Sequence, residues 1–121
     1  MNELLIDRDS IENFIDGDTE MLADLSVIFV RFLPGLMARM NLATNNGDSG
    51  MLREAAHELK GQLGYFFCQS LIEQVGQLEE LAKAEQLDHA DTRVDEVSHG
   101  VDRLLDELRT LTNLELKLER D

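Results

Sequence analysis

The 121-residue chain lacks features that define several classes of protein. Its single cysteine cannot form an internal disulfide, which indicates a reducing compartment. One proline and no tryptophan, beside abundant Leu, Glu, Ala and Asp, favour helix over sheet. No apolar run approaches the ~18 residues needed to cross a bilayer, and the N-terminus has too few apolar residues for a signal peptide. We therefore expect a soluble, cytoplasmic, helical protein.

Basic residues are also scarce. The chain has 11 Lys and Arg against 25 Asp and Glu, which gives a net charge of −14. Nucleic acids and anionic membranes repel such a chain, so neither is an expected partner. Residues 48–67, with 3 acids and 2 bases, are nearly neutral between two strongly negative flanks. The negative charge of the two flanks is explained sufficiently if their acidic residues lie on solvent-exposed helix faces.

Capping and turn residues divide the chain into helices. Asp9-Ser10 predicts the start of a short first helix, and Asp18-Thr19 the start of a second. Pro34 lacks a backbone N–H and disfavours helix at Leu33, so we expect a kink or a break there. The predicted helices are a short one up to Ile15, one from Glu20 to about Phe32, its continuation through Leu42, and ones over about 50–67, about 70–86 and from Asp91-Thr92 to about Leu114.

The long helices are amphipathic and are joined by short loops, a pattern that predicts an all-α fold. We expect an antiparallel up-down four-helix bundle with one or two short additional N-terminal helices. The length fits a single domain, 1–121, with a bundle core over about 18–114 and a tail at 115–121 that extends the last helix or frays. The apolar faces contain Leu22, Leu25, Ile28, Phe29 and Phe32; Leu71, Val75, Leu78, Leu81 and Ala82; and Val94, Val97, Val101, Leu104, Leu105, Leu108 and Leu111.

The predicted helix over 50–67 carries two glycines beside a histidine. Each residue of a helix advances by roughly 100°, which places His57 roughly 150° from the centre of the apolar face. Lys60, Gly61 and Gly64 share its outward side. Glycine in a helix interior costs roughly 1 kcal/mol relative to alanine, so both glycines need a reason. Their bare backbone would let another molecule approach the imidazole closely.

An exposed neutral imidazole beside an ammonium group suits one kind of chemistry. The imidazole nitrogen is a competent nucleophile near neutral pH, and its attack on a partner's acyl phosphate would leave a phosphoryl group on His57. Lys60 would partly balance the negative charge of that group. The chain has no glycine-rich phosphate loop with a Walker lysine, so it would borrow the phosphoryl group rather than take it from ATP.

The stretch Ala56-His57-x-Leu59-Lys60-Gly61 resembles the signature of the histidine-containing phosphotransfer (HPt) domains of two-component phosphorelays. The resemblance extends over most of the chain, because lead-in segments also match at the right spacing. It implies a phosphorelay intermediate, which is a carrier and not an enzyme with kinase activity of its own. The matching lead-in segments are Ile6-Asp7, Gly17 to Leu22, Phe32 to Leu36, Gly47-Asp48 and Leu52-Arg53.

The resemblance implies that His57 is the phosphorylated histidine and that Lys60 stabilises the phosphoryl group. The group would come from an aspartate of one receiver domain and pass to another. The chain would need no cofactor of its own, because the magnesium belongs to the receiver. Expected partners are response-regulator receiver domains and a hybrid sensor histidine kinase, and we expect a monomer. Because the sequence begins with Met1, we expect a free-standing protein, with the end of a larger kinase as the alternative.

The sequence departs from the family pattern after Gly61. The family usually has small residues at the positions of Gln62 and Leu63, and often a glycine at that of Phe67. Cys68 stands where alanine or methionine is common. These changes bear on the packing of this helix end and on the choice of partner.

We expect a docking surface around His57. Tyr65 would project outward as an aromatic anchor on it, with packing on a neighbouring helix as the alternative. Such a surface also supports a second hypothesis, in which the chain is a docking module that binds a receiver or kinase domain independently of phosphate. The surface would consist of Arg53, Glu54, Glu58, Gly61, Gly64 and Tyr65.

A metal site is a third hypothesis, because Glu54-x-x-His57 and Glu96-x-x-His99 have the spacing of ligands in di-iron bundles. All four residues project outward on their helices, so we expect no buried metal centre. His89 and His99 are expected at the surface without a role. Core positions are expected for Cys68, Met21, Met37, Met40 and Met51.

Overall fold

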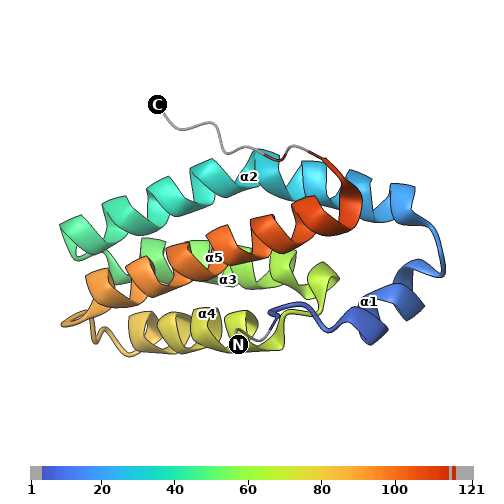
Figure 1. Cartoon of the computed structure of the whole chain (residues 1–121). Helices are drawn as coiled ribbons and strands as arrows, with labels where there is room; N and C mark the ends of the chain where they lie inside the picture. The colour runs from blue at the N-terminus through green and yellow to red at the C-terminus, as the bar shows by residue number, and fades with distance from the viewer. Residues whose placement is uncertain (1–3, 115, 117–121) are drawn as a thin grey trace.

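The computed structural model describes residues 4–114 and 116. Among these residues it has five α-helices, one short 3₁₀ helix and no strand, which confirms the all-α class (Figure 1). The helices are α1 (Arg8–Ile15), α2 (Thr19–Asn46), α3 (Ser49–Leu63), the 3₁₀ helix η1 (Gly64–Phe66), α4 (Gln69–Lys83) and α5 (Ala90–Thr112).

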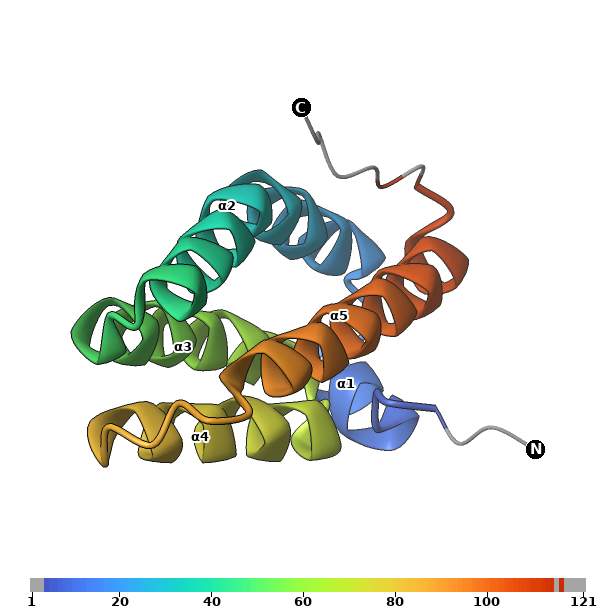
Figure 2. The same ribbon diagram turned by 90° about the vertical axis from the view of Figure 1, so that its left-hand side faces the viewer.

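Helices α2 to α5 form the predicted four-helix bundle, and their directions alternate along the chain (Figures 1 and 2). α3 packs between α2 and α4, and α5 closes the bundle against α2 and α4. The predicted apolar faces of α4 and α5 supply much of the core, because all their members except Leu81 and Leu111 are buried. Met40 is also buried, and Met21, Met37 and Met51 pack against the core as predicted.

The N-terminal segment closes one end of the bundle. Asp7 caps α1, since its carboxylate accepts a hydrogen bond from the N–H of Ser10 at 3.2 Å. The predicted cap at Asp9-Ser10 is therefore wrong, because these residues already lie in the first turn. Glu107 of α5 fastens the residues before the cap: its carboxylate oxygens accept hydrogen bonds from the N–H groups of Leu5 and Ile6, each at 2.9 Å.

Pro34 lies inside α2, so the predicted break is wrong. Figure 2 shows that the axis of α2 bends along its length, which agrees with the alternative prediction of a kink. Proline removes one backbone hydrogen bond, but Leu33 and Leu36 on either side are buried. The packing of these two side chains into the core keeps the helix continuous, because tertiary contacts override local propensity.

The outer face of α2 is more apolar than expected. Leu22 and Phe29 are buried, but Ile28 and Phe32 of the predicted apolar face are 45% and 57% exposed. By length and composition, α2 is the one helix in the described part of the chain that could cross a membrane, contrary to our expectation. This is weak evidence for a membrane span, since the core helix of a soluble bundle passes the same test and α2 packs against α3 and α5.

The last helix begins and ends earlier than predicted. It starts after His89, and the predicted cap at Asp91-Thr92 is wrong, because both residues already lie in the helix. The adjoining Ala90 is buried, so packing draws the chain into the helix before the polar pair. The helix ends at Thr112, before the predicted tail. Residues 115 and 117–121 lie outside the described residues, so the prediction of fraying there stays untested.

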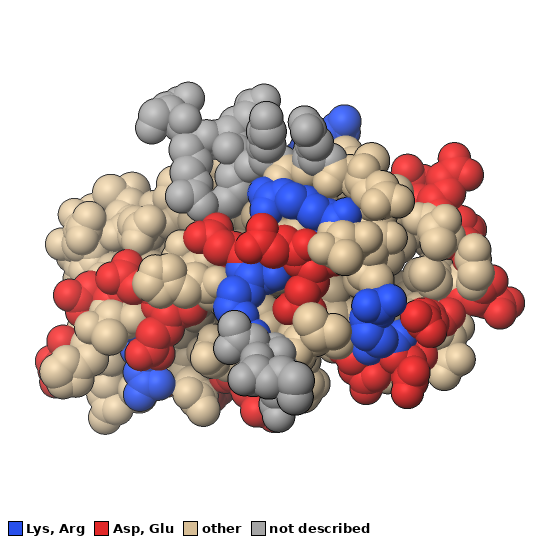
Figure 3. Space-filling model, in the orientation of Figure 1, with Lys and Arg blue, Asp and Glu red and all other residues tan. Residues whose placement is uncertain are grey.

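Charged side chains cover much of the face that carries α5. In Figure 3 acidic residues are spread across this face and basic residues lie among them. This distribution fits the solvated helical surface that the composition predicts.

Candidate functional site

His57 lies on the outward side of α3, as the helical projection predicts. Its side chain is 70% exposed, whereas its neighbours Ala55, Ala56 and Leu59 are buried. Asp48 caps this helix, since its carboxylate accepts a hydrogen bond from the N–H of Met51 at 3.0 Å. The imidazole therefore stands in solvent on a helix whose opposite face is fixed in the core.

Glu79 of α4 joins His57 to Lys60. One of its carboxylate oxygens, Oε2, lies 2.7 Å from Nδ1 of His57, and the other, Oε1, accepts a hydrogen bond from Nζ of Lys60 at 2.5 Å. The Glu79 side chain is only 12% exposed. Two residues that sequence spacing placed on one face of α3 are thus held by a single carboxylate from the next helix.

The surroundings of Glu79 favour its ionised form. Burial by itself raises the pKa of a carboxyl group, but the hydrogen bonds and positive charges supplied by Lys60 and His57 outweigh it. The net result is a pKa lowered from the ordinary value of 4.5. Glu79 is therefore a carboxylate at neutral pH and can only accept hydrogen bonds.

Sequence reasoning did not identify Glu79. It lies on α4, beside the buried Leu78, and is separated from His57 by a turn between helices. Helical periodicity shows which residues share a face of one helix, but not which side chains of two helices meet. A signal was nevertheless present, because an acidic residue bordering the apolar stripe of α4 is placed where that helix meets α3.

The two glycines near His57 have no packing role within the chain. A Cβ atom built on Gly61 or Gly64 would meet no other atom within 4 Å. Neither residue has a positive φ angle, so backbone conformation does not require glycine at either position. Their effect is to leave bare backbone on the surface next to the imidazole.

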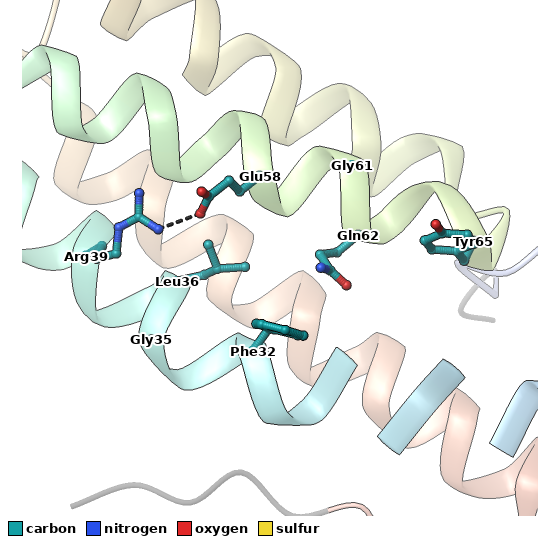
Figure 4. Close-up of a pocket in the computed structure, with 8 residues that line it drawn as sticks. All are labelled: Phe32, Gly35, Leu36, Arg39, Glu58, Gly61, Gln62 and Tyr65. Atoms are coloured by element: carbon teal, nitrogen blue, oxygen red, sulfur yellow. Dashed lines mark hydrogen bonds and ion pairs between the residues drawn. The ribbon is translucent and has the colours of Figure 1, made fainter. Parts of the chain in front are cut away.

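Two hollows adjoin this surface. The first surrounds His57 and is lined by Arg53, Glu54, Glu58 and Glu79. The second is a groove between α2 and α3, where an ion pair links Arg39 to Glu58 (Figure 4). The predicted docking residues therefore divide between the two hollows, with Glu58 common to both and Gly64 lining neither. The groove is lined by Phe32, Gly35, Leu36, Arg39, Glu58, Gly61, Gln62 and Tyr65.

Tyr65 lies in η1 at one end of the groove, and the residue is 50% exposed. Phe32 faces the same groove from α2 (Figure 4). Exposed aromatic rings at the rim of a groove are typical of protein-binding surfaces.

A comparison with models of known protein families identifies the family to which the chain is similar. The family model described as Hpt domain matches residues 24–111, which span most of α2, all of α3 and α4, and nearly all of α5. The chain belongs to the Hpt domain family. Searches of curated proteins and of solved structures found no match. Hpt domains serve histidine phosphotransfer in phosphorelays, act as phosphocarriers rather than enzymes, and interact with receiver domains of response regulators and with kinases.

The end of the histidine helix in this Hpt domain differs from the helix predicted over 50–67. The α-helix stops at Leu63 and tightens into η1, and Phe67 then adopts a left-handed conformation with φ 53°. This conformation costs residues other than glycine roughly 1 kcal/mol or more, which fits the glycine that the family resemblance implies at this position. Here the ring of Phe67 packs against Phe14 of α1, with centroids 5.6 Å apart, which offsets the cost.

Cys68 follows this turn and is fully buried, as predicted for a core residue. Burial raises the pKa of its thiol to about 12, and its Sγ lies 3.6 Å from the carbonyl oxygen of Leu63. The thiol is therefore protonated and unreactive at neutral pH, which argues against a redox role.

The Glu-x-x-His pairs of this Hpt domain do not form a buried metal centre. Glu54, His57, Glu96 and His99 are all exposed, as the helical projection predicts. Within the described part of the chain, no three His, Cys, Asp or Glu residues are grouped so that they could hold a metal ion. His89 is also exposed.

Proposed function

We propose that the chain is a phosphorelay intermediate in which His57 accepts a phosphoryl group from the aspartate of one receiver domain and passes it to another. The observation that carries the proposal is the exposed imidazole, whose Nδ1 is bound to Glu79 while Nε2 has no hydrogen-bond partner among the described residues. Lys60 lies on the same side of α3 with its ammonium group beside Glu79. The Hpt family match supports the same chemistry.

The transfer is a displacement at phosphorus. The lone pair on Nε2 attacks the phosphorus atom of the aspartyl phosphate, a P–N bond forms, and the P–O bond to the aspartate breaks to release its carboxylate. The proton on Nδ1 stays where it is. The same steps in reverse pass the group to a second receiver, so the carrier is regenerated.

This chain supplies the nucleophile, a positive charge and an open surface. Lys60 balances part of the negative charge on the phosphoryl group. Gly61 and Gly64 leave room for the receiver's backbone, and Arg53, Glu54, Glu58 and Tyr65 contact it. The magnesium ion of the reaction belongs to the receiver, and the chain needs no cofactor of its own.

The proposed partners are response-regulator receiver domains and a hybrid sensor histidine kinase, and the proposed location is the cytoplasm. The carrier acts as a monomer. A phosphate-independent docking module is the second candidate, because the groove between α2 and α3 and its exposed Tyr65 would serve binding alone equally well.

Incubation with a receiver domain that carries a radiolabelled phosphoryl group separates the two candidates. We expect acid-labile, base-stable label on His57, complete loss of the label in His57→Gln, and no loss in His99→Gln, a matched control at another exposed histidine. Receiver binding by His57→Gln, measured by calorimetry, should stay close to that of the wild type. Label on a different residue, or retention of label by His57→Gln, would contradict the carrier function, and signalling that survives His57→Gln would favour the docking module.

A further inference from the structure

The N-terminal half of α2 carries an apolar surface that no described helix covers. Seven large hydrophobic residues are exposed in the described part of the chain, and four of them lie on α2. Three of these four, Val27, Ile28 and Phe32, are close together along the helix. The opposite side of the same turns, with Phe29 and Leu33, is buried in the core, and α2 lies along one edge of the bundle (Figure 2). Exposed apolar side chains that cluster in this way mark an interaction surface.

Two charged residues flank the apolar pair Val27 and Ile28 on the outer side of α2. Asp24 precedes the pair and Arg31 follows it, and both are exposed. A step of seven residues brings a helix back to within about 20° of the same direction, so the two charges lie on one line along the surface. Val27 and Ile28 project on either side of that line. We call these four residues the outer stripe of α2.

The outer stripe is complementary to a second copy of itself. When two α2 helices pack antiparallel about a two-fold axis between Val27 and Ile28, both copies contribute the same stripe. Asp24 of each copy then faces Arg31 of the other, and the two apolar pairs meet at the axis. A parallel pair would instead place acid against acid and base against base.

Phe32 extends this complementarity beyond the outer stripe. The antiparallel register that pairs the charges also places Phe32 opposite Ala23 of the other copy. The most exposed large apolar residue of α2 therefore meets a small side chain, which is how packed helices interdigitate. The register follows from the charges alone, so the position of Phe32 supports it independently.

The charge of the chain bears on which partner suits this surface. The net charge of −14 makes two copies repel, so a dimer requires a surface where acids and bases balance. α2 meets this requirement, because it contains two acids and two bases. A membrane suits the surface less well, since helices that lie on membranes carry mainly Lys and Arg beside their apolar face. A second copy of the chain is therefore the best-matched occupant.

We propose that the chain forms a symmetric antiparallel dimer through the outer stripe of α2. A single pair of helices buries little surface, so the dimer should dissociate in about the micromolar range. Phe32 also lines the groove between α2 and α3, so a receiver in the groove and a second copy of the chain compete for this side chain. The dimer is a resting form from which the monomeric carrier is released. This consequence rests on the proposed function, whereas the self-association does not.

The first test uses the purified protein alone. Sedimentation equilibrium between about 1 μM and about 1 mM should show a monomer that dimerises as the concentration rises. Ile28→Gln should raise the dissociation constant by about 10- to 100-fold, because the substitution occurs twice in a symmetric dimer. Leu4→Gln, a control at an exposed apolar residue outside α2, should leave it unchanged. A monomer at every concentration would overturn the proposal, as would a monomer that binds phosphatidylcholine vesicles through Ile28.

Charge reversal tests the antiparallel register. Asp24→Arg places a base opposite Arg31 at both ends of the interface and should raise the dissociation constant by about 3- to 10-fold. Adding Arg31→Asp restores opposite charges in reversed order, so the double variant should return to within about twofold of the wild type. A second reversal would not repair general structural damage. Tighter association of Asp24→Arg alone, or no recovery in the double variant, would overturn the antiparallel dimer.

The third test connects the dimer to the carrier function. At about ten times the dissociation constant, labelling of His57 by a phosphorylated receiver should be slower per carrier molecule by about threefold or more than in dilute solution. Ile28→Gln should show no such decrease, since Ile28 does not line the groove. Labelling by phosphoramidate, a small donor, should be independent of concentration. A constant rate with the receiver would refute the competition, whereas a dimer that takes no label from any receiver would support self-association and refute the proposed function.

Discussion

Gly61 and Gly100 both lie inside helices, but the two regions of the molecule use glycine for opposite reasons. Around Gly61, on the face of α3 that carries His57, a Cβ atom would meet nothing within 4 Å. Gly100 of α5 is buried against α4, and a Cβ atom there would lie 2.6 Å from Cδ1 of Leu71. A side chain at Gly100 fits only if Leu71 moves, whereas a side chain at Gly61 would obstruct nothing within the chain and only a partner molecule that binds there.

Gly100→Ala should have the largest effect on stability. The new methyl group requires the buried Leu71 to move, and overpacking of this kind costs about 1–3 kcal/mol. Urea denaturation monitored by circular dichroism measures the loss. In a Leu71→Ala background the obstructing methyl groups are absent, so the cost of Gly100→Ala should shrink there. An equal cost in both backgrounds would show that the contact with Leu71 is not its source.

Gly61→Ala should move stability and function in opposite directions. Alanine is the better helix former by up to about 1 kcal/mol, so the variant should resist urea better than the wild type. Phosphoryl transfer from a receiver should nevertheless fall by about tenfold or more, because small displacements of reacting groups are costly. Labelling by phosphoramidate, a small donor with no backbone to accommodate, serves as the control and should be unchanged. If Gly61→Ala accepts the phosphoryl group from the receiver as fast as the wild type, Gly61 is not needed for the approach of a partner.

Glu79→Gln should destabilise the protein by less than Gly100→Ala, and in a pH-dependent way. The folded protein lowers the pKa of Glu79 from 4.5, so its stabilising contribution is complete above that value and is lost as the pH falls through the lowered pKa. The difference in urea midpoint between wild type and variant should therefore be largest near pH 7 and should shrink below about pH 4. A difference in urea midpoint that grows as the pH falls would contradict a stabilising role of the Glu79 carboxylate.

Arg39→Ala should have the smallest effect on stability. The ion pair between Arg39 and Glu58 spans the groove between α2 and α3, but both side chains are substantially exposed, 39% and 54%. Such pairs contribute about 0–1 kcal/mol. The same substitution should change receiver binding measurably, because it alters the charge of the groove. Thermal melting measures the change in stability, and calorimetric titration with a receiver domain measures the change in affinity. A large loss of stability with unchanged affinity would contradict the prediction.

Sequence reasoning predicted the bundle and the exposure of His57, because both depend on the periodicity of single helices. It failed where contacts between elements decide the outcome. Of the kink or break expected at Pro34, only the bend is present, because Leu33 and Leu36 pack into the core and keep the helix continuous. Two caps were misplaced because several polar residues near each helix start could serve, and packing selects among them. Glu79 was missed for the same reason, since its partners lie on a different helix.

The buried thiol of Cys68 makes the molecule convenient to label. Because its sulfur is enclosed and its pKa is about 12, reagents that attack thiolates should not modify the native fold. A cysteine introduced in place of Tyr65 or Arg53 would then be the sole reactive thiol on the surface. A crosslinker attached to that cysteine would covalently capture the proteins that bind there. Slow modification of Cys68 itself would report transient opening of the turn between α3 and α4.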